Sequence, residues 1–319
     1  MASIDIGALF LARSASFYAG QNKSLLADSR DSLHIRALRA CGTLMTPFST
    51  IALPLFAPAD KPERYPKALA SGADAVIFDL EDAVALSDKD SARTLLLEAR
   101  GLLASAPCPL LVRINPEGGP FHAADLIAVR ELSLAALVVP KVESADTVRR
   151  VADKTGLPVL AIIESGPGLA AARNVAAAGA RLVFGSIDFV ADLGCAHSRE
   201  ALLFPRCELV LASRLAGAPA PIDGVTTAVK DSDLVRDDVA YAVSLGFGGK
   251  LLIHPAQIEP AEAGLQPAAE DVRWASRVLA AGQEGGAASL DGMMVDAPVR
   301  LRAEQILRRA QRGRREVAQ

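Results

Sequence analysis

The 319-residue sequence lacks closely spaced cysteines and long apolar runs, and each absence excludes a class of protein. Its four cysteines are too widely scattered for a zinc site or a redox motif, which favours a reduced, cytoplasmic compartment. No apolar run reaches the roughly 18 to 20 residues that a transmembrane helix needs. We therefore expect a soluble protein that does not enter a membrane.

An excess of one charge is also missing. Basic residues number 34 and acidic residues 37, and both are mixed along the chain, so the formal net charge is only −3. A chain without a sustained positive field is not expected to bind nucleic acid or an anionic membrane surface. Small molecules are the expected partners.

Short apolar runs alternate with longer amphipathic stretches from residue 53 onward, a pattern typical of repeated β-strand and α-helix units around a parallel sheet. Most runs are apolar throughout, as expected for strands that are buried on both faces. Eight runs fit this description, at residues 53–58, 75–80, 109–115, 134–141, 157–165, 180–189, 222–229 and 250–255. Eight strands with a helix after nearly every one predict an α/β fold of the closed (β/α)₈ TIM-barrel type.

An open, doubly wound dinucleotide-binding sheet is the alternative fold. Its phosphate-binding signature, G-x-G-x-x-G directly after the first strand, is missing from the sequence. The glycine-rich segment at residues 246–249 precedes a strand instead of opening a helix, and we interpret it as a turn. The closed barrel is therefore favoured.

Helix boundaries follow from capping residues. Asp60, with Glu63 three residues later and Pro62 in the first turn, forms a capping-box pattern that predicts a helix ended by Gly72. Further helices are expected at residues 88–104, 123–132, 144–154, 168–178, 199–215, 231–245, 270–281 and 298–312. The last two lie beyond the eighth strand and do not belong to the barrel.

The chain divides into three expected parts. Residues 1–49 form an N-terminal extension, residues 50–262 the catalytic barrel, and residues 263–319 a C-terminal helical lid or extension. The N-terminal part is rich in Ser, Arg and Ala, but its acidic residues Asp5, Asp28 and Asp31 disfavour an organelle transit peptide. We expect a mobile or accessory segment there.

Charged side chains follow nearly every predicted strand, at the end of the barrel where the reactive groups of this fold lie. In chain order they are Asp60, Asp79, Glu81, Asp82, Arg113, Lys141, Glu164, Asp188 and His254. Desolvated charges that converge are costly unless they pair or bind a ligand. The pattern therefore predicts an active site at the carboxyl ends of the strands.

Glu164 and Asp188 close the predicted fifth and sixth strands, which are neighbours in the barrel. Two carboxylates together with waters and substrate oxygens are typical of a Mg²⁺ site. The alternative is that each carboxylate caps the helix that follows it. Their equivalent positions on adjacent strands favour the metal.

Arg113 should point into the barrel mouth, where its fork can hold a carboxylate or a developing enolate oxygen. Its alternative role is to pair with the acidic residues that end the second strand, and both roles can coexist. The carboxylates of Asp79, Glu81 and Asp82 should repel one another and raise at least one pKa unless a cation compensates. Lys141 is the candidate for that cation, and a Schiff base at Lys141 is the competing interpretation.

With these residues in hand, the sequence resembles the citrate lyase β-subunit-like family, within the wider HpcH/HpaI aldolase group that also contains malyl-CoA and citramalyl-CoA lyases. The resemblance covers nearly everything from about residue 53 to residue 309. It rests on ordered motifs: LFAPADKPERYPKALASGADAVIFDLEDAV at 55–84, LVRIN at 111–115, VPKVES at 139–144, AIIESGPGL at 161–169, FGSIDF at 184–189, GGKLLIHPAQI at 248–258 and GMMVDAPV at 292–299.

The resemblance implies roles for positions already singled out. Glu164 and Asp188 match the Mg²⁺ ligands of the family, and Glu164 is also expected beside the substrate. Arg113 matches the arginine that binds the substrate carboxylate. Glu81 and Asp82 match acidic residues that support the metal waters and are expected in the catalytic site.

Two further residues enter only through the resemblance. Asp296 matches a catalytic aspartate that in related lyases comes from a neighbouring subunit, so a homotrimer or hexamer is expected, with the C-terminal extension packed on that neighbour. Lys67 lies close to where relatives receive coenzyme A, and it is the expected coenzyme A contact among the basic residues after the first strand. A solvated helix face is the alternative for Lys67.

The expected function is that of a Mg²⁺-dependent carbon–carbon lyase that cleaves or forms a β-hydroxyacyl-CoA, such as malyl-, citramalyl- or citryl-CoA. The partners are then an acyl-CoA thioester and a small 2-oxo acid. Arg113 would stabilise negative charge, and Asp296 would exchange the proton on the acyl-CoA carbon. Two alternatives stay open: a metal-dependent aldolase that acts on free hydroxy-oxo acids, and a non-catalytic subunit of a citrate lyase complex.

Overall fold

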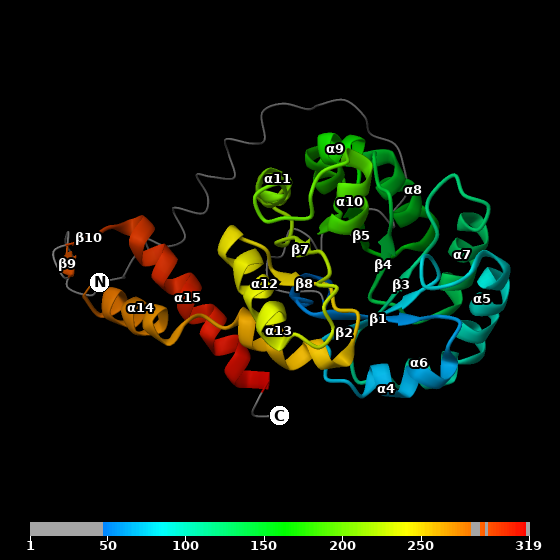
Figure 1. Ribbon diagram of the computed structural model, residues 1–319, viewed down its shortest axis with the longest axis horizontal. Coiled ribbons are helices and arrows are strands. Elements are labelled where there is room, and N and C mark those ends of the chain that lie inside the picture. The colour runs from blue at the N-terminus through cyan, green and yellow to red at the C-terminus, as the bar shows by residue number, and fades with distance from the viewer. Residues whose placement is uncertain (1–46, 282–287, 291–292, 317–319) are drawn as a thin grey trace, which may run out of the picture. The chain divides into compact units, whose positions relative to one another are not determined.

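The computed structural model describes residues 47–281, 288–290 and 293–316. All but the last three residues of the expected N-terminal extension lie outside the described residues. Within them, eight parallel strands follow one another in chain order around a single sheet (Figure 1). They are β1 (Pro54–Pro58), β2 (Ala75–Asp79), β3 (Leu110–Arg113), β4 (Ala136–Val139), β5 (Val159–Ile163), β6 (Arg181–Phe184), β7 (Ile222–Asp223) and β8 (Gly249–Lys250).

The sheet closes on itself, as the alternation of strands and helices predicts. A parallel bridge joins Leu55 of β1 to Leu252, just beyond β8. The Phe56 N–H donates to the Leu252 carbonyl over 2.8 Å, and the Leu252 N–H donates to the Pro54 carbonyl over 2.9 Å. The TIM-barrel prediction is confirmed.

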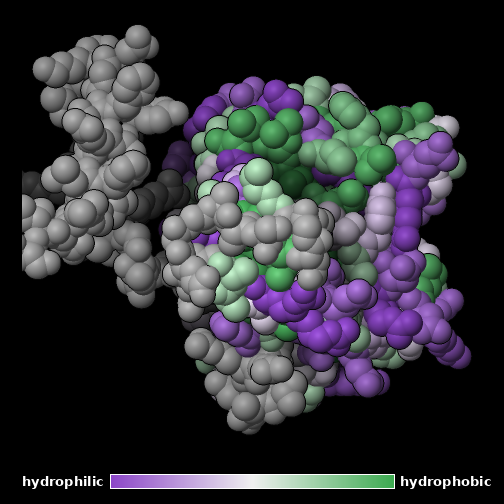
Figure 2. Space-filling view, turned by 90° about the vertical axis from the view of Figure 1, so that its left-hand side faces the viewer, coloured by the Kyte–Doolittle hydropathy of each residue, from purple (hydrophilic) through white to green (hydrophobic). Residues whose placement is uncertain are grey.

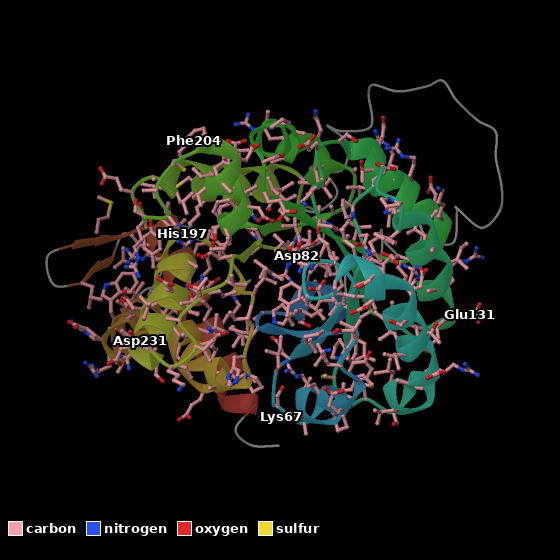
Figure 3. All side chains as sticks on the ribbon, turned by 45° about the vertical axis from the view of Figure 1, so that its right-hand side comes forward. Lys67, Asp82, Glu131, His197, Phe204 and Asp231 are labelled. Atoms are coloured by element: carbon pink, nitrogen blue, oxygen red, sulfur yellow. The ribbon has the colours of Figure 1, made fainter. Side chains whose placement is uncertain are left out.

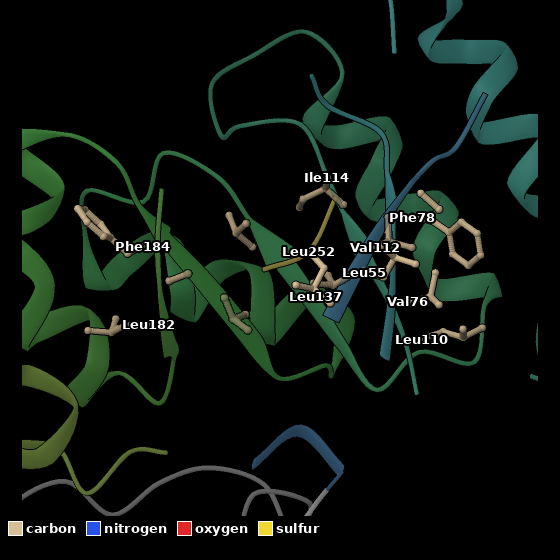
Figure 4. Packing of buried hydrophobic residues seen from close by; sticks show 14 of the residues in the cluster. Leu55, Val76, Phe78, Leu110, Val112, Ile114, Leu137, Leu182, Phe184 and Leu252 are labelled. Carbon is tan, nitrogen blue, oxygen red and sulfur yellow. The ribbon is translucent and has the colours of Figure 1, made fainter. Parts of the chain in front are cut away.

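Alternation along each strand separates two apolar layers. Ile77, Leu111 and Ile162 are among the residues that fill the inside of the barrel. Their chain neighbours, such as Phe78 and Val112, belong to the outer layer between the strands and the helices, part of which Figure 4 shows. Because side chains alternate with a period of two residues, positions that continue the inward series past a strand end are directed into the barrel mouth.

The amino end of the barrel is plugged by the short helix α3 (Pro47–Thr50) and the residues after it. Phe48 and Ile51 belong to the inner apolar layer. The buried guanidinium of Arg181 donates to their carbonyl oxygens over 3.0 and 2.7 Å and to the Ala220 carbonyl over 2.9 Å. This end is sealed, which leaves the carboxyl ends of the strands as the open mouth.

Helices cover the outside of the barrel. They are α4 (Tyr65–Leu69), α5 (Lys89–Glu98), α6 (Arg100–Ala104), α7 (His122–Ala128), α8 (Ala145–Thr155), α9 (Gly166–Ala177), α10 (Ser186–Leu193), α11 (Leu203–Leu215), α12 (Ser232–Leu245) and α13 (Ile258–Leu265). Ser144, Ser165 and Asp231 begin α8, α9 and α12, each accepting a hydrogen bond from a backbone N–H in the first turn. None of the described helices has the length and apolar content that a membrane span requires.

The predicted capping box at Asp60 is wrong. A 3₁₀ turn, η1 (Pro62–Arg64), precedes the five-residue helix α4, and neither begins with a side-chain cap. Asp60 instead pairs with Lys61 over 3.0 Å. Pro66 has no N–H to donate to an earlier turn, so a single regular helix cannot run through this segment.

Three other boundaries differ from the prediction. The helix expected at residues 88–104 is divided at Ala99 into α5 and α6. The sixth strand ends at Phe184, and the rest of the apolar run at residues 180–189 begins helix α10. Strands β7 and β8 have only two residues each, so the segments that follow them are loops.

The C-terminal segment has a small core of its own. Helix α14 (Ala269–Ala281) packs on helix α15 (Ala297–Glu316), and an antiparallel pair of strands, β9 (Ala288–Leu290) and β10 (Met293–Val295), lies between them in the chain. Ala275, Val278, Val295, Ala303 and Ile306 form its buried cluster. The two helices match the prediction, whereas the strand pair was not predicted.

Candidate active site

Arg113 and the acidic residues after β2 form the centre of the site. Strands β2 and β3 pair so that Asp79 lies opposite Arg113. The Arg113 Nε and Nη2 atoms donate to the two carboxylate oxygens of Asp79 over 2.7 and 2.6 Å. Nη1 lies 2.9 Å from Glu81 Oε2 and 3.2 Å from Asp82 Oδ2. The guanidinium also stacks over the Phe56 ring, 4.8 Å from its centroid.

Asp79 orients this arginine and does not face a ligand. Besides Arg113, it accepts hydrogen bonds from the backbone N–H groups of Glu81 and Ala83, over 2.9 and 3.0 Å. Burial lowers the pKa of Arg113, but the hydrogen bonds and charge of Asp79 outweigh burial and raise that pKa above its ordinary value. Only the Nη1 side of the guanidinium is left to face a further anion. The expected pairing of Arg113 with the second strand's carboxylates is therefore present.

Glu81 is a buried carboxylate with unused acceptor capacity. Burial raises its pKa to about 7, and the charges of Asp82 and Asp79 add to burial while Arg113 opposes it. The predicted repulsion within the cluster is thus present, although burial is the larger cause. Its Oε2 atom has no hydrogen-bond partner among the described residues, because the 2.9 Å approach of Arg113 is not aligned as a hydrogen bond. An oxygen of this kind is ready to accept a ligand.

Glu164 follows β5 in the inward series and is 5% exposed. Its Oε1 accepts the backbone N–H of Lys141 over 2.7 Å. Burial raises the pKa of Glu164 to about 8, the charge of Glu81 raises it further, and Asp188 also contributes. Glu81, Glu164 and Asp188 are therefore close enough to act on one another electrostatically.

Gly185 makes the space that Glu164 occupies. A Cβ atom at this position would lie 2.5 Å from both the Cβ and the Oε2 of Glu164, and 2.8 Å from a methyl carbon of Ile162. No side chain fits there unless the carboxylate moves. The backbone at the end of β6 therefore forms one wall of the site.

Lys141 has an unusual backbone that serves the same carboxylate. Its φ of 52° makes it the only described residue other than glycine with a positive φ. This conformation is costly for a residue with a Cβ atom and is often found at functional sites. It directs the N–H toward Glu164, while the half-exposed side chain brings Nζ to 3.8 Å from Glu81 Oε1. Lys141 thus acts as the compensating cation that the sequence predicts, and the Schiff base stays a prediction.

Asp188 does not end a strand, contrary to the prediction. It lies in the first turn of helix α10 with a partly buried side chain. The helix starts there because Gly185 turns the chain away from β6. A carboxylate in this position is stabilised by the helix dipole, and its charge still reaches Glu164.

The donor set fits a hard cation that keeps several of its ligands as water or substrate. Within the described ranges, no group of three or more His, Cys, Asp or Glu side chains is arranged to enclose a metal ion. Mg²⁺ commonly binds through one or two carboxylates and retains waters. Buried Glu164 and partly buried Asp188 are two such carboxylates, and buried Glu81 lies near Glu164 with one oxygen that accepts no hydrogen bond from the described residues.

Asp296 and Lys67 lie apart from this cluster. Asp296 is exposed at the start of α15, where its Oδ1 accepts the Val299 N–H over 3.1 Å, and no contact of the described residues joins it to the strand ends. Lys67 is exposed on α4, distant in Figure 3 from Asp82 at the barrel mouth. The single chain brings neither residue to the carboxylates, so the expected roles of both stay predictions.

Residues 79–82 form the acidic segment of the site. Sequence reasoning missed a buried polar layer behind this segment, built from Lys89, Arg93, Asn115 and Asp125. Lys89 and Arg93 belong to the buried stripe of α5, together with Ala92 and Leu96. Two cations within an otherwise apolar stripe indicate buried partners. That signal was available in the sequence.

The site geometry can now be set beside known proteins. Residues 53–255, which include all eight strands, match the sequence model described as HpcH/HpaI aldolase/citrate lyase. The chain belongs to this family. The resemblance noted from the motifs is confirmed. Every barrel residue of the candidate site lies within the matched segment, and Asp296 lies beyond it.

Several members of the HpcH/HpaI family are similar over most of their length. A citrate lyase subunit beta-like protein from Mycobacterium tuberculosis is 37% identical over 266 residues, which cover 80% of this chain and 94% of the relative. A (3S)-malyl-CoA thioesterase from Cereibacter sphaeroides is 33% identical over 274 residues, covering 83% and 95%. The crystal structure of protein CitE from M. tuberculosis in complex with magnesium, acetoacetate and coenzyme A is 35% identical, with a TM-score of 0.73, and covers 82% of this chain and 98% of that one.

Proposed function

We propose that the protein is a Mg²⁺-dependent carbon–carbon lyase that cleaves, or in reverse forms, a β-hydroxyacyl-CoA thioester. The observation that carries this proposal is the meeting of buried Glu81 and Glu164 with the Arg113 guanidinium at the strand ends. Two buried carboxylates with raised pKa values, one with an unpartnered oxygen, favour binding of a hard cation. The CitE relative was solved with magnesium and coenzyme A, which supports the same cofactor and substrate class here.

Glu164 and Asp188 would hold the Mg²⁺, with Glu81 and Asp82 supporting its waters. When bound, the ion supplies Lewis-acid polarisation of the substrate's oxygen atoms. The Lys141 N–H and the Gly185 backbone hold Glu164 in one orientation, so the ligand is preorganised. Glu164 would also lie beside the substrate.

Arg113 would bind the negative charge of the 2-oxo acid portion. Asp79 occupies its Nε and Nη2 atoms, so Nη1 is the group that faces the substrate anion. Glu81 and Asp82 lie 2.9 and 3.2 Å from Nη1, so a substrate anion would displace them from this atom. Asp79 keeps the guanidinium fixed during that exchange.

Cleavage moves one proton from the substrate hydroxyl to solvent water and one from an acid onto carbon. As the hydroxyl becomes the carbonyl of the 2-oxo acid, the carbon–carbon bond breaks and its electron pair passes to the acyl-CoA carbon. Asp296 would protonate that carbon in cleavage and remove the same proton in condensation. Since Asp296 makes no contact with the strand ends within one chain, a second copy would supply it.

A homotrimer or hexamer would meet that requirement, and the surface supports association. Helices α10 and α11 expose apolar side chains, and an apolar area occupies the upper part of the face in Figure 2. These side chains are Leu193, Leu203, Phe204, Leu211 and Leu215. An exposed apolar area of this kind is typical of a protein interface. The separate core of α14 and α15 supports treating residues 263–319 as an extension of the barrel at 50–262.

Coenzyme A would lie over the first βα unit. Lys67, with Lys61 and Arg64 nearby, offers cations for its phosphates on exposed surface. The thioester end would extend to the barrel mouth. The described cysteines Cys108, Cys195 and Cys207 are free thiols, in keeping with a cytoplasmic protein.

The proposal is tested by turnover of the purified protein on malyl-, citramalyl- and citryl-CoA, with Mg²⁺ and with a chelator, alongside Asp296→Asn. We expect Mg²⁺-dependent cleavage of at least one thioester and loss of most activity in the variant. Cleavage of free hydroxy-oxo acids alone would establish the aldolase. Absence of turnover together with stable binding of an acyl-carrier protein would establish the non-catalytic subunit.

A further inference from the structure

Lys89 is a buried cation without a carboxylate partner at ion-pair distance among the described residues. It is the first residue of α5, and it is 3% exposed. Its Nζ atom donates instead to two backbone carbonyl oxygens, those of Leu80 over 2.8 Å and Glu81 over 2.6 Å. Burying an ammonium group is costly unless it has partners. A methionine side chain would fill the same space without the cost of burying a charge. The lysine is therefore explained by the two carbonyl groups to which its ammonium group donates.

The peptide groups that Lys89 holds carry the acidic segment of the site. Leu80 and Glu81 follow directly on β2, and Asp82 comes next in the chain. The Leu80 carbonyl also accepts a hydrogen bond from Asn115 Nδ2 over 3.0 Å. The Glu81 carbonyl accepts the Val84 N–H over 3.0 Å in addition to the Lys89 ammonium. The backbone of the segment is therefore fixed from behind by side-chain donors.

Asn115 is itself fixed by a buried ion pair. Asp125, which is fully buried, accepts the backbone N–H and the side-chain amide of Asn115, each over 2.7 Å. Arg93, one turn after Lys89 on α5, donates to Asp125 over 2.8 Å. Lys89 thus belongs to a rigid polar layer that connects helix α5 and strand β3 to the back of the acidic segment.

The Glu81 side chain depends on this backbone for its direction. Its Oε2 has no hydrogen-bond partner among the described residues, and its Oε1 lies 3.8 Å from Lys141 Nζ. No described hydrogen bond is made by its carboxylate, whose Oε2 is held only by the ion pair with Arg113 Nη1 over 2.9 Å. The point from which the side chain reaches Arg113 follows from the position of the Leu80–Glu81 peptide groups.

We propose that Lys89 is a positioning residue of the cation site, which fixes the Leu80 and Glu81 carbonyls and thereby directs the Glu81 and Asp82 carboxylates into the barrel mouth. The inference rests on the proposed Mg²⁺ function. Removing the ammonium takes one of two donors from each carbonyl, because Leu80 keeps Asn115 Nδ2 and Glu81 keeps the Val84 N–H, so the segment is held less firmly and the carboxylates lose their common direction. Residues that orient the groups around a metal ion typically change metal affinity by about 10- to 100-fold, and Lys89 acts on the two carboxylates that would support the waters of the ion.

Lys250 offers a matched control. It is also a buried lysine, 2% exposed, but its Nζ pairs with Asp223 over 3.0 Å and makes no described contact with the acidic segment. Arg206 stays paired with Asp223 when Lys250 is removed. Lys89→Met and Lys250→Met therefore both remove a buried ammonium, and only the first removes a donor from Leu80 and Glu81.

The test is calorimetric titration of the wild-type protein, Lys89→Met and Lys250→Met with Mg²⁺, with circular dichroism and thermal denaturation to quantify the folded fraction. We expect both variants to be less stable, and only Lys89→Met to bind Mg²⁺ about 10- to 100-fold more weakly. Should Lys89→Met fail to fold, Lys89→Gln, which keeps an amide donor, is expected to fold with a smaller loss of affinity. The inference about Lys89 would be overturned, and the proposed function left standing, if the folded Lys89 variant bound Mg²⁺ with wild-type affinity or if Lys250→Met lost as much affinity. A wild-type protein that does not bind Mg²⁺ would overturn the proposed function and this inference together.

Discussion

Asp79 and Arg113 lie opposite each other at the ends of adjacent strands, and two hydrogen bonds, 2.7 and 2.6 Å long, join the guanidinium to both carboxylate oxygens. This pair fixes the arginine so that its remaining amino group faces Glu81 and Asp82. A fixed positive group beside buried carboxylates is what an anionic substrate and a divalent cation require together. The geometry follows from strand register alone.

Arg113→Lys is predicted to reduce kcat strongly while the fold is kept. Lysine keeps the charge but cannot donate to both Asp79 oxygens in a planar fork. Loss of one oriented donor to transition-state charge typically costs about 10²- to 10³-fold in kcat. Arg150→Lys is the control, because Arg150 makes a similar two-point contact with Glu117 over 2.7 Å, and no described contact joins that pair to Asp79, Glu81 or Asp82. Steady-state kinetics should show the loss only at Arg113, and an equal loss in both variants would contradict the assignment.

Gly185→Ala is predicted to weaken Mg²⁺ binding. The added methyl group would lie 2.5 Å from the Glu164 carboxylate, so Glu164 must move. We expect an affinity loss of about ten-fold or more, measured by calorimetry. In Gly101→Ala the new methyl group meets no atom within 4 Å, and this variant should bind as the wild type does. Unchanged affinity in Gly185→Ala would mean that the space beside Glu164 does not matter.

Lys141→Gly should be more stable than Lys141→Ala. Both variants lose the ammonium group, but only alanine keeps a Cβ atom at a φ of 52°. The left-handed conformation costs about 1–2 kcal/mol for a residue with a Cβ atom. Glycine avoids this cost, but its greater freedom in the unfolded chain offsets part of the gain in the free energy of unfolding. Urea denaturation should therefore favour glycine by roughly 1 kcal/mol. Equal or greater stability of the alanine variant would show that the turn is unstrained.

The metal-free protein should lose stability as the pH rises from about 5 to 8. Burial and neighbouring charge raise the pKa of Glu81 to about 7 and of Glu164 to about 8, against 4.5 when unfolded. The folded state therefore holds protons that the unfolded chain has released, and that stabilising contribution is lost as the pH rises through the folded pKa values. Thermal denaturation in a chelator should show a falling Tm across this window, less steep in Glu164→Gln. A Tm that rises with pH across the same window in both proteins would contradict this prediction.

The barrel and the inward direction of its charged residues were predictable because the strands are apolar and evenly spaced. Asp79, Arg113 and Glu164 each continue the inward series of a strand, so their convergence follows from a period of two residues. Asp188 shows where this reasoning ends. Residues 180–189 look like one apolar strand, and the change from strand to helix after Phe184 is visible only in the folded structure.

The degree of burial of the charged side chains could not be predicted from the sequence either. The predicted repulsion among the acidic residues is present, yet burial raises the pKa of Glu81 more than its neighbours do. The partners of Lys89 are backbone carbonyls, which every residue carries, so no sequence pattern identifies them. Asp296 was singled out by its motif, whereas its place in an assembly depends on a second chain and stays a prediction.

The most direct measurement is calorimetric titration of Mg²⁺ into the wild-type protein, Glu164→Gln and Glu143→Gln. Glu164 is buried at the end of β5, and Glu143 is an exposed carboxylate whose Oε1 accepts the Ser165 hydroxyl over 2.6 Å. We predict that the wild type and Glu143→Gln bind one Mg²⁺ per chain with equal affinity, and that Glu164→Gln does not bind. Absence of Mg²⁺ uptake by the wild type, or wild-type affinity in Glu164→Gln, would contradict the account.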